Sequence, residues 1–254
     1  MIPAHTDGLI WFLLILGPFI LLQRRLHREL QAVFLLLSKR QDISLVVFSL
    51  LFFPGVLLHE TSHYLMALLL RVRTGRFSLV PHPLPDGRLQ LGYVETAQSD
   101  FMRDSLIGAA PLLVGSLFVT YVGVARLGFD QLWQAWYAGS LAAIFQALAG
   151  IYHQPDFWLW FYLAFTVSST MLPSASDRRA WLVLGIVALV LFLLGLAAGA
   201  GPWLLENLAP ALNNGSRALA LAVLISALLH LFLLPFVWGL RLLISRVTGL
   251  SVGF

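Results

Sequence analysis

Long runs of apolar residues, separated by short polar segments, dominate the pattern along this 254-residue chain. A helix that crosses the hydrocarbon core of a bilayer needs about 17 to 25 mostly apolar residues. Six runs come close to this length or exceed it, although the first and fourth are slightly short: residues 9–22, 44–70, 105–126, 157–173, 180–200 and 218–240. The pattern therefore predicts an all-α, multi-pass membrane protein with about six transmembrane helices.

A further apolar stretch, from Trp133 to Tyr152, contains two glutamines and three Gly or Ser positions. These polar and small residues are compatible with a re-entrant or tilted helix as well as with a spanning one. Both alternatives stay open for this stretch.

One segment between the runs has a different periodicity. Residues 77–80 and 88–94 alternate between apolar and polar positions on either side of a Pro-Asp-Gly turn signal at 85–87. This arrangement is typical of a β-hairpin. We expect a hairpin insertion over residues 76–95 and no other β structure.

The composition excludes an ordinary soluble protein. Hydrophobic residues make up 59% of the chain and charged residues only 11%, whereas soluble domains carry about 25% charged residues. Cysteine is absent, which excludes a disulfide scaffold and a thiolate metal site. The net charge of +4 comes from arginine clusters beside the apolar runs. Because such clusters contact lipid headgroups, we expect membrane lipids and no nucleic acid as partners.

No internal repeat or long linker divides the sequence. We therefore expect a single membrane-embedded domain over residues 1–254, with its core at 44–200.

The distribution of arginine predicts the orientation. Residues 71–104 contain five arginines, whereas 127–156 and 201–216 contain no Lys or Arg. Because basic residues favour the cytoplasmic side, we expect 71–104 to be cytoplasmic in a multi-pass protein of the plasma membrane. The basic residues at 23–42 fit this orientation only if the first run does not span simply, or if 26–38 lies in the membrane interface.

An H-E-x-x-H motif formed by His59, Glu60 and His63 lies inside the apolar helical stretch 50–70. Residues four positions apart share one face of a helix, so both imidazoles can bind one Zn²⁺ ion while Glu60 lies beside the metal-bound water. Ionisable side chains at membrane depth cost about 2.5 kcal/mol or more each unless they are paired or bound to metal. The motif predicts a zinc site with Glu60 as the catalytic residue. The alternative is a buried polar cluster that only stabilises helix packing.

A hydrolytic zinc site has three protein ligands and an open position for water, so one ligand must come from elsewhere in the chain. The candidates by residue type are His82, Asp86, His153, Asp156, Asp177 and His230. Asp177 is favoured because it is the carboxylate that adjoins an apolar run on the same side as the histidine pair. A helix-capping role with Ser174 is compatible with metal binding there. His230 fits a packing histidine, and Asp86 fits a turn residue.

These elements together resemble the site-2 protease family of intramembrane zinc metalloproteases. The H-E-x-x-H helix is followed by the hairpin, by a Gly-Pro element at 108–111 and by a later run that ends near Asp177. The resemblance covers residues 50–180. Thr170 and Arg178 stand where the family usually has Asn and Gly.

The resemblance implies a site and an activity. In that family two motif histidines and a distant aspartate bind zinc, which here implies His59, His63 and Asp177 as the ligands. It further implies that Glu60 activates water, that the hairpin at 77–94 guides an unwound substrate, and that a transmembrane substrate helix is cut within the membrane.

Two other functions stay open: a metal-transporting membrane protein in which the histidine pair is a transit site, and a non-catalytic protein that keeps the zinc site. A transporter should show polar residues along several runs, but apart from the motif and His230 the runs are nearly free of them. A pure metal binder would not need Glu60. The sequence therefore favours a zinc-dependent metalloendopeptidase that acts on transmembrane proteins, and it does not indicate the oligomeric state.

Overall fold

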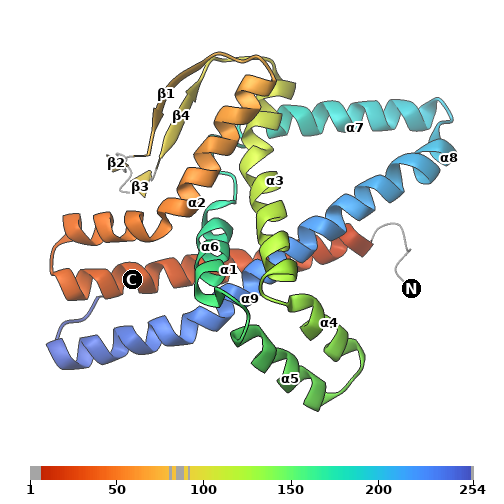
Figure 1. Ribbon diagram of the computed structural model, residues 1–254. Helices are drawn as coiled ribbons and strands as arrows, with labels where there is room; N and C mark the ends of the chain where they lie inside the picture. Colours follow the sequence, from red (N-terminus) through yellow and green to blue (C-terminus); the bar gives the residue numbers. More distant parts are fainter. Residues whose placement is uncertain (1–6, 80–81, 84–88, 91, 253–254) are drawn as a thin grey trace.

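The computed structural model describes residues 7–79, 82–83, 89–90 and 92–252. Helices form most of it (Figure 1). In chain order they are α1 (Asp7–Ser38), α2 (Gln41–Leu69), α3 (Phe101–Ala125), α4 (Phe129–Tyr137), α5 (Leu141–Tyr152), α6 (Phe157–Thr170), α7 (Trp181–Ala197), α8 (Gly201–Trp203), the π-helical turn η1 (Leu204–Leu208) and α9 (Ala209–Thr248). The expectation of a predominantly helical chain is confirmed.

Within the described residues, four helices are long and apolar enough to cross a membrane: α1, α2, α3 and the continuous helix Gly201–Thr248. They are compatible with an integral membrane protein, but the expected six spans are not confirmed. α6 has 14 residues, which at 1.5 Å per residue is roughly 21 Å, shorter than a hydrocarbon core of about 30 Å. The run 157–173 forms so short a helix because Pro173 lacks an N–H and restricts the residue before it.

The stretch from Trp133 to Tyr152 is not one helix. α4 and α5 meet at Gly139, whose φ of 64° lies in the left-handed region that glycine tolerates. Ser140 caps α5 by accepting a hydrogen bond from the Ala143 N–H at 3.2 Å. The two short helices form a hairpin at the lower end of the molecule (Figure 1), so this stretch does not cross a membrane as a single helix.

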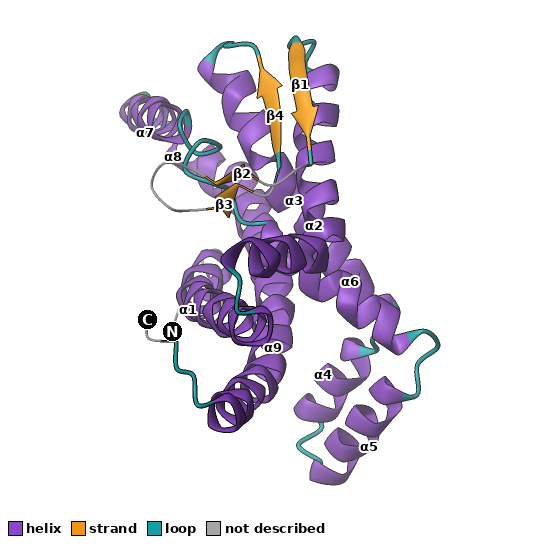
Figure 2. Cartoon of the chain, turned by 90° about the vertical axis from the view of Figure 1, so that its left-hand side faces the viewer, coloured by secondary structure: helices purple, strands orange, loops and turns teal. Residues whose placement is uncertain are grey.

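The predicted β-hairpin is present beside α2 (Figure 2). It consists of two antiparallel strand pairs: β1 (Thr74–Ser78) with β4 (Tyr93–Thr96), and β2 (His82–Pro83) with β3 (Leu89–Gln90). Phe77 lies opposite Val94, which sets the register of the longer pair. The predicted turn at 85–87 lies outside the described residues.

α1 and α9 lie side by side and run in the same direction (Figure 1). Near their N-terminal ends, Asp7 forms an ion pair with Arg217 at 2.6 Å. Further along, the fully buried Glu29 pairs with Arg241 of α9 and, at 2.8 Å, with Arg25 of its own helix. A buried carboxylate is costly unless it is paired, so Glu29 ties α1 to α9.

α1 continues beyond the predicted run 9–22 to residue 38 without a break. The basic residues at 24, 25 and 28 therefore lie inside a helix and not in a loop between two spans. α1 and α9 also contribute to the main hydrophobic core, where Phe19 and Val223 pack with side chains of α3 and α6. The main hydrophobic cluster thus includes residues of both ends of the chain.

α2 is bent (Figure 1), and it contains Pro54, which has no N–H to donate and so interrupts the helical hydrogen-bond ladder. Three residues before this proline, the Leu51 carbonyl accepts a hydrogen bond from the Tyr162 hydroxyl of α6 at 2.9 Å. Gly55 lies so close to α6 that a Cβ atom there would collide with the Thr166 carbonyl. The bend and this glycine allow the following turns of α2 to approach the C-terminal end of α6.

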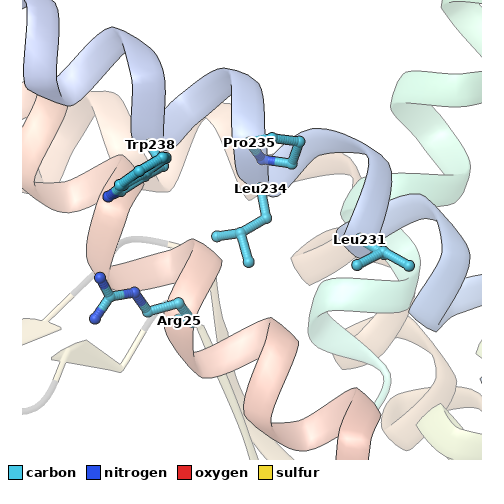
Figure 3. A pocket seen from close by; sticks show the side chains of 5 residues that line it. All are labelled: Arg25, Leu231, Leu234, Pro235 and Trp238. Atoms are coloured by element: carbon cyan, nitrogen blue, oxygen red, sulfur yellow. The ribbon is translucent and has the colours of Figure 1, made fainter.

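A hollow of about 400 Å³ lies between α1 and α9 (Figure 3). It is lined by Arg25, Leu231, Leu234, Pro235 and Trp238. None of these residues belongs to the motif, and none is of a type that binds zinc.

Candidate metal centre

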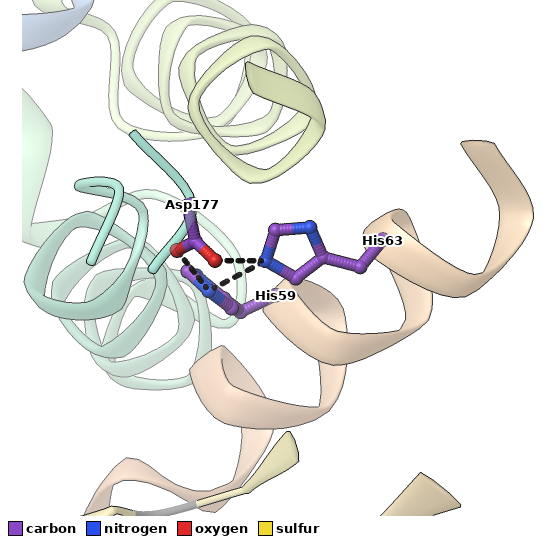
Figure 4. Close-up of side chains that lie close together, drawn as sticks. All are labelled: His59, His63 and Asp177. Atoms are coloured by element: carbon purple, nitrogen blue, oxygen red, sulfur yellow. Dashed lines mark hydrogen bonds and ion pairs between the residues drawn. The ribbon is translucent and has the colours of Figure 1, made fainter. Parts of the chain in front are cut away.

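His59 and His63 lie one turn apart on α2 and point toward the same spot (Figure 4). Their Nε2 atoms are 3.1 Å apart. Asp177, from the loop between α6 and α7, reaches this spot with both carboxylate oxygens. Its Oδ1 lies 3.4 Å from His63 Nε2, and its Oδ2 lies 3.7 Å from His59 Nε2. The structure thus brings the two motif histidines together with the carboxylate that the sequence favoured.

A backbone carbonyl holds each imidazole ring. His59 Nδ1 lies 2.7 Å from the carbonyl of Thr170, the last residue of α6, and His63 Nδ1 lies 2.8 Å from the Ile107 carbonyl of α3. A carbonyl only accepts hydrogen bonds, so each Nδ1 carries the proton, and each Nε2 of the neutral ring presents a lone pair. The sequence analysis missed both partners because a backbone carbonyl has no residue-type signal.

The donor set and its spacing fit a divalent cation. Two lone pairs that face each other beside a carboxylate repel unless a cation lies between them. In a tetrahedral zinc site with bonds of about 2.0–2.1 Å, two ligand atoms are about 3.3 Å apart. The observed separations of 3.1, 3.4 and 3.7 Å bracket this value. His59, His63 and Asp177 could therefore hold a metal ion, with the fourth tetrahedral position left for water.

Reciprocal hydrogen bonds hold the loop that carries Asp177. The Ser174 N–H donates to Asp177 Oδ2 at 2.7 Å, and the Asp177 N–H donates to the Ser174 hydroxyl at 3.2 Å. This is the predicted capping box, formed in the turn that precedes α7. The Ser174 N–H donor stabilises the ionised form of the Asp177 carboxyl. The ionised form is the one that binds a metal ion.

Gly108 of α3 lies directly against the same loop. A Cβ atom at this position would overlap the backbone carbonyl oxygen of Asp177 and would lie 2.9 Å from its carbonyl carbon. One turn before Gly108 on α3, the Ser105 carbonyl accepts a hydrogen bond from Trp181 Nε1–H at 3.3 Å. The glycine of the Gly-Pro element thus has a local physical role, because it allows the ligand loop to touch α3.

Glu60 follows the first histidine on α2 and is buried, with 7% of its surface exposed. The β-hairpin packs against it at Gly92, where a Cβ atom would lie 3.0 Å from Glu60 Cγ and 3.1 Å from Val56 Cγ1. The hairpin therefore covers part of the Glu60 side chain. The sequence analysis did not single out Gly92, whose only signal is a glycine within a strand pattern.

Among the described residues, the candidates His153, Asp156 and His230 do not join this group. His230 is fully buried where α9 meets α1 and α6. His153 is exposed at the end of α5, and Asp156 adopts a positive φ of 55° just before α6. Asp86 and the side chain of His82 lie outside the described part of the chain.

Comparison with known proteins adds no relative. No protein family model, curated protein or solved structure matches this chain. The geometry around the histidine pair is therefore the basis for a functional proposal.

Proposed function

We propose that the chain is an intramembrane zinc metalloendopeptidase in which His59, His63 and Asp177 bind the ion and Glu60 is the general base. The convergence of donor atoms from two distant segments, α2 and the loop after α6, is the observation that carries this proposal. A cluster that served packing alone would pair its acceptors with donors. Here two Nε2 atoms and a carboxylate face one another.

A zinc ion held by these ligands would polarise a carbonyl group and lower the pKa of its bound water toward about 7. Glu60, which adjoins His59 on α2, would accept a proton from the attacking water and donate that proton to the leaving amine. Burial of Glu60 keeps bulk water from competing for this proton. The residues of the chain would thus supply the ligands, the base and a sheltered site for hydrolysis of a peptide bond.

The place of the motif supports a substrate within the membrane. α2 is one of the four long apolar helices, and a transmembrane substrate must leave helical hydrogen bonding before its carbonyl can be attacked. The β-hairpin lies against Glu60 at Gly92, and strand edges bind extended peptides through backbone hydrogen bonds. We therefore expect transmembrane protein segments as substrates, in keeping with the resemblance to site-2 proteases.

Metal analysis tests the zinc site. Protein purified in detergent without chelators should contain about one zinc ion per chain. His59→Ala and Asp177→Ala should each weaken zinc binding at least about 10-fold, since even partners behind the ligands change affinity about 10 to 100-fold. His153→Ala is the matched control, because this exposed histidine contacts the Ala149 carbonyl and lies outside the site. Absence of zinc from the wild type, or wild-type affinity in Asp177→Ala, would contradict the proposal.

Glu60→Gln tests the chemical step separately. The amide keeps the size of the side chain but cannot act as a base, so zinc should stay bound while turnover falls about 10² to 10⁴-fold. Cleavage of a transmembrane helix substrate in proteoliposomes, with zinc measured on the same samples, checks both. Full turnover in zinc-loaded Glu60→Gln would refute the mechanism. A zinc-bound wild type that cleaves no transmembrane helix would favour a non-catalytic metal protein.

A further inference from the structure

A series of buried and part-buried hydrogen bonds connects α1 and α9 to His59, the first proposed metal ligand. The Ser169 hydroxyl lies 2.9 Å from Nε2 of His230, a fully buried residue of α9. Gln23 of α1 donates through its side-chain amide to the Ser169 carbonyl at 2.6 Å. The next residue, Thr170, supplies the carbonyl that accepts from His59 Nδ1. Gln23 and His230 thus both bond to Ser169. Ser169 directly precedes Thr170, whose carbonyl orients His59.

The direction of the hydrogen bond to His230 follows from its second partner. His230 Nδ1 lies 2.7 Å from the Ser226 carbonyl, which can only accept, so Nδ1 carries the proton and Nε2 accepts from the Ser169 hydroxyl. Phe19 and Phe165 contact the imidazole, each with its ring centroid 5.3 Å away, and limit its rotation. His230 therefore presents an acceptor in a fixed position to the end of α6.

The C-terminal end of α6 affects two of the three ligands. The last carbonyls of a helix have no helical partner, and two of them here accept hydrogen bonds from Gln23 and His59. From this point the chain continues into the loop that carries Asp177. A shift of the helix end would therefore move His59 through its hydrogen bond and Asp177 through the backbone.

We infer that Gln23 and His230 are positioning residues, which hold the end of α6 in place and thereby set the metal affinity of the site. This inference rests on the proposed zinc site and adds a role for α1 and α9, which contribute no ligand to it. Loss of a hydrogen-bond partner behind a zinc ligand typically lowers metal affinity about 10 to 100-fold. Gln23 and His230 bond to Ser169 and not to a proposed ligand itself. We therefore expect the lower end of that range, about 10-fold.

The experiment compares folded variants of the full chain in detergent. Chelator competition measures zinc affinity, and the absorption spectrum of the Co²⁺-substituted protein reports the ligand geometry. His230→Leu and Gln23→Leu should each weaken zinc binding about 10-fold and alter the Co²⁺ spectrum. His230→Gln keeps a side-chain acceptor and should retain both properties of the wild type. His27→Leu is the matched control, because His27 lies on the same helix as Gln23 and packs against Phe48 and Phe52, but it takes part in none of these hydrogen bonds.

Ser169→Ala is a second variant that removes only the hydroxyl, so it tests the inference even if His230→Leu does not fold. Wild-type affinity and spectrum in folded Ser169→Ala or His230→Leu would overturn the inference. An equal loss in His27→Leu would also overturn it, since that result indicates a general packing effect. If the wild type binds neither zinc nor Co²⁺, the proposed metal site is itself wrong. If the wild type and His230→Gln bind alike and His230→Leu binds more weakly, the positioning role is supported.

Discussion

Gly108→Ala tests how the fold holds Asp177, the proposed third ligand, in place. The added Cβ atom would overlap the Asp177 carbonyl oxygen and would lie 2.9 Å from the Asp177 carbonyl carbon. Favourable contacts between carbon atoms begin at about 3.5 Å. The loop must therefore move away by roughly 0.6 Å to bring the distance between the new Cβ and the Asp177 carbonyl carbon to this value. It must move further to remove the overlap with the carbonyl oxygen.

This retreat would displace a ligand whose position has little tolerance. The Asp177 oxygens lie 3.4 Å from His63 Nε2 and 3.7 Å from His59 Nε2, and zinc–ligand distances vary by only about 0.2 Å. If the proposed zinc site is correct, Gly108→Ala should weaken zinc binding about 10 to 100-fold and reduce the proposed proteolytic turnover in parallel. Overpacking at the contact should also lower the free energy of unfolding by about 1–3 kcal/mol.

Chelator competition measures the affinity, and unfolding of the same preparations measures the stability. Gly17→Ala is the matched control, because it adds the same methyl group within α1 at a position where the new Cβ meets no packed neighbour within 4 Å. It should leave zinc affinity unchanged. Wild-type zinc affinity in folded Gly108→Ala would refute the argument that this contact sets the position of Asp177.

Two further predictions concern stability. Glu29→Ala should lower the free energy of unfolding in mixed micelles by about 3–5 kcal/mol, because it leaves the largely buried Arg241 without its carboxylate partner. Asp42 is exposed, so Asp42→Ala should change this free energy little. Equal effects of the two substitutions would contradict the prediction. Asp100 accepts a hydrogen bond from the Arg103 N–H at the start of α3, which lowers the pKa of Asp100 below its ordinary value of 3.8. A lowered pKa stabilises the folded state above the unfolded pKa, and this contribution is lost as the pH falls below about 4. Asp100→Asn should therefore flatten the melting temperature against pH in that range, and an unchanged profile would refute the assignment.

The sequence by itself determined the elements whose signals are local. Uninterrupted apolar runs predicted α2 and α3, and helical periodicity placed His59 and His63 on one face of α2. Alternation on both sides of residues 85–87 predicted the β-hairpin. These predictions needed only the spacing of neighbouring residues, so no knowledge of packing was required.

The number of long helices was less accessible to the sequence. An apolar run does not reveal whether its residues form one helix long enough to span or a shorter one. The run 157–173 forms only 14 helical residues, and the stretch from Trp133 to Tyr152 divides at Gly139. Helix ends depend on where the chain turns to pack against neighbouring helices. The hydropathy of a run does not contain this information.

Only the tertiary structure decided how the site is assembled. The sequence favoured Asp177 among several candidates, but its approach to the histidine pair depends on the close contact with Gly108. The carbonyls of Thr170 and Ile107, which orient the two imidazoles, could not be predicted because every residue carries such a group. Which carbonyls reach His59 and His63 is set by how α2 packs against α6 and α3. The geometry of the proposed metal site therefore follows from long-range packing, whereas the identity of the motif follows from local spacing.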